Sequence, residues 1–145
     1  MIYVVLNIFQ INRISHKMRL EDRIERLRSN SMDKRVEAAI DISTFNLSRE
    51  IGDYQARKLA PPLKQMLRTG ESYEKGTAAS ALARLAYEHP DPVRDATDDF
   101  ADLLYDDTRY QEYYYNASNA ILALAALGNE NSISPIQQSL GWYRE

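Results

Sequence analysis

The chain has 145 residues, a formal net charge of −3, no cysteine and two histidines. This length suffices for one domain with a substantial buried core. The composition excludes disulfides and thiolate chemistry, and His16 and His89 are too isolated to supply a histidine-rich zinc site. A cysteine-free chain is compatible with a reducing compartment, so we expect a cytoplasmic protein.

Charge is distributed unevenly along the sequence. Between Arg13 and Arg35 eight cations face four anions, whereas between Glu88 and Glu112 nine anions face two cations. The net acidity argues against general nucleic-acid binding. We therefore expect a molecule with one basic and one acidic region.

The first 17 residues do not share the pattern of the rest. Their apolar stretch, Met1 to Phe9, is interrupted by Asn7, and it is shorter than the roughly 20 residues that span a membrane. Its positive charges come after the apolar run, which is the wrong side for a signal peptide. We interpret residues 1–17 as a tail outside the main domain, 18–145. The tail is either a β-prone extension or the result of a start codon placed upstream of Met18.

An amphipathic helix is predicted from about Arg19 to Ser29. Leu20, Ile24 and Leu27 form its apolar stripe, and its other faces are charged. Such a helix can cap the end of an array, because a terminal repeat needs a polar outer face. Asp33 is predicted to be the N-cap of the next helix.

One pattern then occurs three times. A pair of small or apolar residues is followed, three and six positions later, by large apolar residues. The pairs begin at Ala38, Ala78 and Ala120, 40 and 42 residues apart. Self-similarity at this period is typical of α-solenoids.

The pattern predicts three helical hairpins. Pro61 and Pro62 fall inside one helix, which we expect either to kink or to begin near Pro61. The segment His89-Pro-Asp-Pro92 is expected to end one helix, with Asp91 as the N-cap of the next. Gly128 is expected to end the last long helix. The expected helices cover residues 34–47 and 55–68, then 73–87 and 92–105, then 111–127 with a short helix over 134–140.

The second unit resembles a HEAT repeat. It reads Lys75-Gly-Thr-Ala-Ala-Ser-Ala-Leu-Ala-Arg-Leu85 and continues with Asp91-Pro-Val-Arg94. The resemblance covers about Asp33 to Leu140 and implies an all-α fold, a short right-handed α-solenoid of about three HEAT-like hairpins with an N-terminal capping helix. It also implies a scaffold that binds proteins, although the first unit lacks the Asp-Pro turn and the third has tyrosines at its entry.

An acidic stripe is the first candidate binding surface. Its carboxylates recur at helical spacing within 92–105, and the resemblance would place them in the groove of the superhelix. We expect this groove to bind a basic or mixed partner segment, with tyrosines at its rim; the alternatives are a solvated acidic face and tyrosines that only complete the core. The candidate residues are Asp95, Asp98, Asp99, Asp102, Tyr105, Tyr113 and Tyr114.

A second candidate surface is basic. Arg19, Arg23 and Arg26 follow one another along one side of the first helix, and Arg35 comes shortly after. Together they form an alternative, polyanion-binding site, as on a nucleic-acid-binding scaffold. The competing interpretation is a capping helix whose arginines pair with neighbouring acids. A third possibility is that the end after Trp142 docks on a neighbouring chain or a second copy.

Catalytic motifs are absent from the sequence. Five glycines form no phosphate-binding loop, and no nucleophile has a histidine base nearby in a recognisable motif. We therefore expect a non-enzymatic protein without cofactor, metal or membrane partner.

Overall fold

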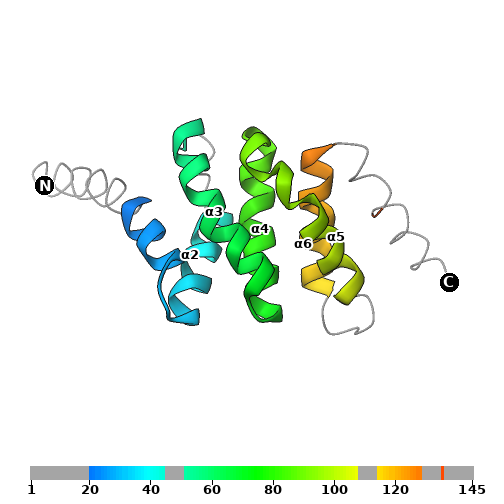
Figure 1. Ribbon diagram of the computed structural model, residues 1–145, viewed down its shortest axis with the longest axis horizontal. Helices are drawn as coiled ribbons and strands as arrows, with labels where there is room; N and C mark the ends of the chain where they lie inside the picture. The colour runs from blue at the N-terminus through cyan, green and yellow to red at the C-terminus, as the bar shows by residue number, and fades with distance from the viewer. Residues whose placement is uncertain (1–19, 45–50, 108–113, 129–134, 136–145) are drawn as a thin grey trace, which may run out of the picture.

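The structure is a computed structural model that describes residues 20–44, 51–107, 114–128 and 135. Within these ranges every regular element is a helix, which confirms the expected all-α class for the described part (Figure 1). The tail 1–17 and the predicted helix over 134–140, except for Pro135, lie outside this description. The elements are a helix over residues 20–27, α2 (Met32–Thr44), α3 (Asp53–Thr69), α4 (Ser72–Glu88), the 3-10 helix η2 (Asp91–Ala96), α5 (Thr97–Asp107) and α6 (Tyr114–Leu127).

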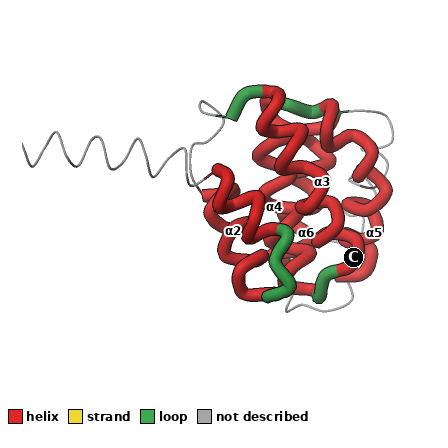
Figure 2. Tube along the Cα trace, turned by 60° about the vertical axis from the view of Figure 1, so that its left-hand side comes forward, coloured by secondary structure: helices red, strands yellow, loops and turns green. Residues whose placement is uncertain are grey.

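Helix α4 lies at the centre of the molecule. It packs against α2 on one side and α6 on the other, as Figure 2 shows, and α3 runs along it. Helix α5 packs along α6, while η2 touches α3, α4 and α5. The helices therefore follow one another along the long axis, from the helix over 20–27 to α5 and α6 (Figure 1).

The closely packed hairpins differ from the predicted ones. The sequence pattern paired the helices now seen as α2 and α3, and paired α4 with the helix that follows it. In the structure α3 packs along α4 and α5 along α6, whereas α2 and α3 are not a closely packed pair. The reason is the connection: only Gly70 and Glu71 separate α3 from α4, and so short a link folds one helix back onto the other.

The predicted core positions are buried. In α4 the repeat residues Ala78, Ala79, Leu82 and Leu85 are at most 4% exposed. The matching positions of α2 and α6 are also buried except for Ile121, which is partly buried, and Phe45, which lies outside the described residues. Alanine at these positions lets neighbouring helix axes approach closely. The repeated pattern therefore marks the interfaces between α2, α4 and α6.

Helix α3 runs unbroken through Pro61 and Pro62. The alternative expectation, a helix that begins near Pro61, is wrong. The prolines remove the donors that would reach the carbonyls of Arg57 and Lys58, but both of these residues are exposed, so water can satisfy those carbonyls. Burial of seven side chains along the helix, Pro62 among them, offsets the loss.

The helix predicted over 92–105 consists of two parts. A 3-10 segment, η2, precedes α5, and the Thr97 hydroxyl donates to the Arg94 carbonyl at 2.7 Å where they meet. Pro90, not Asp91, flanks the start of η2, and no side chain caps it. Closely spaced prolines favour this tighter turn because they cannot donate backbone hydrogen bonds.

The structure also places the predicted end of α6 and the predicted start of α2. Gly128 follows α6 with φ +59°, the left-handed conformation expected of a glycine after a helix. Helix α2 begins at Met32, so Asp33 lies in its first turn and is not the N-cap. A carboxylate there still favours the helix through its dipole.

Candidate functional site

The predicted acidic stripe divides into two rows in the structure. Asp95 and Asp99 face α3, where Lys64 and Arg68 lie 31 residues earlier in the chain. The Lys64 Nζ is 2.8 Å and 3.1 Å from the two carboxylate oxygens of Asp95, and the Arg68 Nε donates to Asp99 at 2.9 Å. These two carboxylates therefore join α3 to η2 and α5, and we call them the inner acidic pair.

The second row differs from the first because neither of its carboxylates pairs with a cation of α3. Asp98 and Asp102 are exposed, and neither forms an ion pair with any described residue. Tyr105, 36% exposed, comes three residues after Asp102, as Asp102 comes four after Asp98, so all three lie on one face of α5. We call Asp98, Asp102 and Tyr105 the outer acidic row. Like charges one turn apart cost a few tenths of a kcal/mol.

The predicted rim tyrosines are not placed. Tyr113 lies outside the described residues, and Tyr114 is the first residue of α6 with its side chain outside the description. Whether they extend the outer acidic row stays a prediction.

The predicted basic surface is largely neutralised within the molecule. Arg23 is 2% exposed and its Nε lies 2.6 Å from Asp41, so it is a buried residue rather than part of an exposed face. Arg26 lies 3.0 Å from Asp22 and 3.2 Å from Glu37. Arg19 lies outside the described residues. Of these pairs, Arg26–Asp22 is of the kind expected of a capping helix, whose arginines would pair with acids of the same helix, whereas Asp41 and Glu37 belong to α2.

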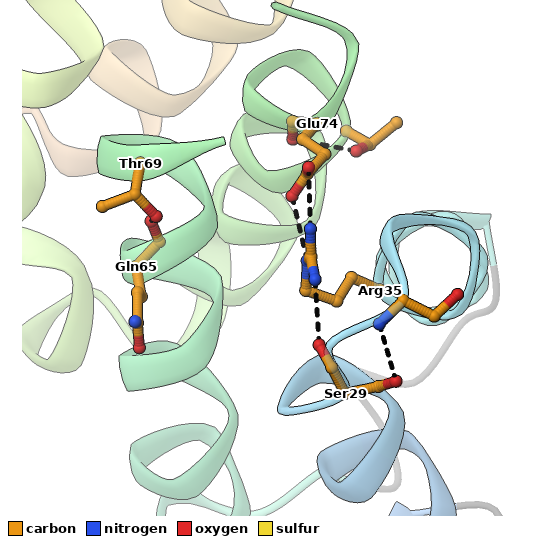
Figure 3. A network of polar contacts seen from close by, with 7 residues as sticks. Ser29, Arg35, Gln65, Thr69 and Glu74 are labelled. Carbon is orange, nitrogen blue, oxygen red and sulfur yellow. Dashed lines mark hydrogen bonds and ion pairs between the residues drawn. The ribbon is translucent and has the colours of Figure 1, made fainter. Parts of the chain in front are cut away.

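Arg35 is also engaged, and more strongly. Its guanidinium donates two hydrogen bonds to the Glu74 carboxylate at 2.9 Å and 3.1 Å and a third to the Ser29 carbonyl at 2.9 Å (Figure 3). The Glu74 side chain is 4% exposed and that of Arg35 23%. The hydrogen bond to Glu74 raises the pKa of Arg35 above its ordinary value. Arg35 therefore fixes α2 and the preceding loop to α4.

A polar cleft surrounds this network. It has a volume of about 310 Å³ and lies between the helix over 20–27, α2, α3 and α4. Gln65 and Thr69 of α3 line its other side, with the Thr69 hydroxyl bonded to the Gln65 carbonyl at 2.8 Å (Figure 3). Two of the charged groups that line the cleft, the Arg35 guanidinium and the Glu74 carboxylate, bond to each other, so the contacts across the cleft hold helices together.

Sequence reasoning missed a hollow on the opposite side of α4. Side chains of α2, α4 and α6 enclose about 410 Å³ there. Tyr87 is 81% exposed and Leu122 60%, although both are large apolar or aromatic residues. One sequence feature could have indicated the hollow: Leu122 is a large apolar residue that falls outside the repeated core pattern, so it was free to face outward. We call this hollow the α4–α6 groove, lined by Ser43, Ser80, Ala83, Arg84, Tyr87, Leu122 and Ala126.

Metal binding and membrane insertion find no support in the part of the chain that is described. No group of three or more His, Asp or Glu side chains there is arranged to hold a metal ion. No described helix has the length and apolar character needed to cross a bilayer.

No protein-family model, no curated protein and no solved structure matches this chain.

Proposed function

We propose that the protein is a non-enzymatic scaffold of HEAT-like helical repeats that binds a basic or mixed-charge segment of another protein on the outer acidic row. The observation that carries the proposal is the pair of exposed carboxylates on Asp98 and Asp102, which form no ion pair among the described residues and stand in line with Tyr105. The tyrosines at 113 and 114 extend this surface in the proposal.

The contrast with the neighbouring inner acidic pair supports this assignment. Asp95 and Asp99 have cations of α3 opposite them, so their charges are already paired within the chain. Asp98 and Asp102, one turn apart, repel each other in the isolated protein. A lysine or arginine of a partner would relieve that repulsion, and its aliphatic stem would lie against the tyrosine ring.

The array of helices supports a solenoid-like scaffold. Helices with alanine-rich interfaces at intervals of 40 and 42 residues pack side by side, with α4 between α2 and α6. Arrays of this kind present extended surfaces suited to peptide segments. The engaged arginines at 23, 26 and 35 favour a protein partner over a polyanion, because their charge is already paired.

The test uses a peptide library and a matched pair of variants. Peptides selected on the wild-type protein should be enriched in lysine and arginine. Fluorescence anisotropy then measures their dissociation constants for wild type and for Asp98→Asn with Asp102→Asn. Loss of two exposed charge contacts should weaken binding about tenfold, and binding should also weaken as salt rises.

The control variant is Asp53→Asn with Asp91→Asn. It changes the net charge by the same amount but removes exposed carboxylates that pair with Arg57 and Arg94. Its affinity should equal that of the wild type. Equal weakening by both variants would show a general charge effect, and unaltered binding by the Asp98 and Asp102 variant would exclude the outer acidic row.

A further inference from the structure

Helix α6 has an unusual composition for a helix with an exposed face. Its 14 residues, Tyr114–Leu127, contain no Asp, Glu, Lys or Arg. Ala120, Ala123 and Leu124 face the core, whereas Ser118, Leu122 and Ala125 are exposed. A helix that is uncharged on all sides is typical of one that is covered on all sides. The outer face of α6 therefore has the chemistry of an interface.

The α4–α6 groove gives this face its shape. Leu122 of α6 and Tyr87 of α4 project from the surface, whereas Ser80, Ala83 and Ala126 are small side chains that form a hollow beside them. Projections and hollow thus lie together on one face. Arg84 is the one charged residue among the described residues that line the groove, and its Nη1 lies 3.4 Å from the Ser43 carbonyl.

A face that carries both a projection and a hollow can complement itself. In a two-fold dimer each copy presents the same patch, so the projection of one copy meets the hollow of the other in both directions. A different partner would have to supply both features itself. The low charge of the face also means that two copies repel each other little.

The available area is sufficient for a weak dimer. Helix α4 has 17 residues, which at 1.5 Å per residue is about 25 Å of length. Two neighbouring helices present a width of about 20 Å, so each copy offers about 500 Å². The total of about 1,000 Å² is at the lower limit of specific interfaces, where affinities are modest.

We propose that a second copy of this chain docks on the α4–α6 groove, with Leu122 and Tyr87 of each copy inserted against Ser80, Ala83 and Ala126 of the other. This surface is separate from the outer acidic row on α5. The dimer would leave that row free, and a pair of scaffolds would then bind two partner segments.

Sedimentation velocity over a concentration series tests this proposal on the full chain. The wild type should show a concentration-dependent monomer–dimer equilibrium with a dissociation constant in the micromolar range or weaker, because an interface near the lower size limit binds weakly. Leu122→Glu and Tyr87→Glu each place charges in an apolar contact, and each should raise that constant at least tenfold. Both side chains are exposed in the monomer, so the variants should fold, which circular dichroism verifies.

Tyr54→Glu is the matched control. Tyr54 is 66% exposed, comparable with Tyr87, but it lies on α3, with its ring under the Lys58 ammonium at 4.7 Å. This variant should dimerise like the wild type. A wild type that stays monomeric up to about 500 µM would overturn the proposal and leave the groove to a different protein. Dimerisation unaffected by Leu122→Glu and Tyr87→Glu would place the contact on another surface.

Discussion

The two sides of α4 are joined to their neighbours by different chemistry. Toward α2 the shortest polar contact is ionic, with Arg35 held by the buried carboxylate of Glu74. Toward α6 it is neutral: the Asn116 amide donates to the Ser72 carbonyl at 2.7 Å and to its hydroxyl at 3.1 Å, and Asn119 donates to the Gly76 carbonyl at 3.1 Å. We call these the ionic junction and the amide junction.

The difference shows how similar helices find their correct neighbours. Alanines line both junctions, so packing alone distinguishes them poorly. A buried carboxylate without its arginine, or a buried amide without its carbonyl, would be costly. The polar groups therefore disfavour wrong helix pairings, because a wrong pairing would leave a buried polar group without its partner.

Breaking the ionic junction should have the largest effect. Arg35→Met leaves the Glu74 carboxylate, whose side chain is 4% exposed, without its cation. We expect the free energy of unfolding, measured by urea denaturation, to fall by about 3 kcal/mol. The double variant Arg35→Met with Glu74→Met should recover most of this loss. If the double variant is no more stable than Arg35→Met alone, the cost does not arise from an unpaired carboxylate.

Breaking the amide junction should cost less. Asn116→Ala removes two hydrogen bonds, and because Ser72 is exposed, water can satisfy its carbonyl and hydroxyl groups; we expect a loss of about 1–2 kcal/mol. The same denaturation measurement applies. Ser72→Ala, which removes only the hydroxyl acceptor, should cost less than Asn116→Ala. A loss at Asn116 as large as that at Arg35 would remove the distinction between the two junctions.

A pH titration sharpens the comparison and should give the smallest effect. Because the pKa of Arg35 is raised in the folded state, its stabilisation is complete below the unfolded pKa. It is lost only as pH rises through the folded value, above any working pH. Arg35→Lys replaces this group by one with an ordinary pKa near 10.4, whose stabilising contribution is lost as pH rises through its own folded value.

Relative to the wild type, Arg35→Lys should therefore lose about 1 kcal/mol more at pH 11 than at pH 8. Thermal melts at both values measure the difference. Asn116→Ala serves as the reference, because the loss it causes should not change between these values. A constant difference between Arg35→Lys and the wild type would mean that the lysine charge adds nothing at the ionic junction.

The sequence predicted the helices and their buried faces well, because apolar periodicity reports which side of a helix is covered. Ala78, Leu82 and Phe100 were all expected in the core and are buried. It predicted the pairing of helices less well, since hairpin partners depend on loop geometry that periodicity does not encode. The division of the predicted helix 92–105 into η2 and α5 was also missed, because apolar periodicity does not report the local effect of Pro90 and Pro92 on the backbone.

The candidate sites show where sequence reasoning stops. Helical spacing indicated correctly that Asp98 and Asp102 are exposed, but it could not show that Asp95 and Asp99 meet cations 31 residues earlier. Helical spacing could not show the burial of Arg23 against Asp41 either, since the two residues lie on different helices. The α4–α6 groove arises only when three helices are placed together. Contacts between distant segments thus decide which charges remain available to a partner.

The central position of α4 also has a consequence for motion. This helix contacts α2, α3, η2, α5 and α6, whereas the other helices have fewer neighbours among the described elements. Helices with few packed neighbours can open locally while the rest of the molecule stays folded. Backbone amides of α4 should therefore exchange with deuterated water last, and those of the helix over 20–27 far earlier. The molecule would then open from its ends inward, with α4 the last helix to lose its structure.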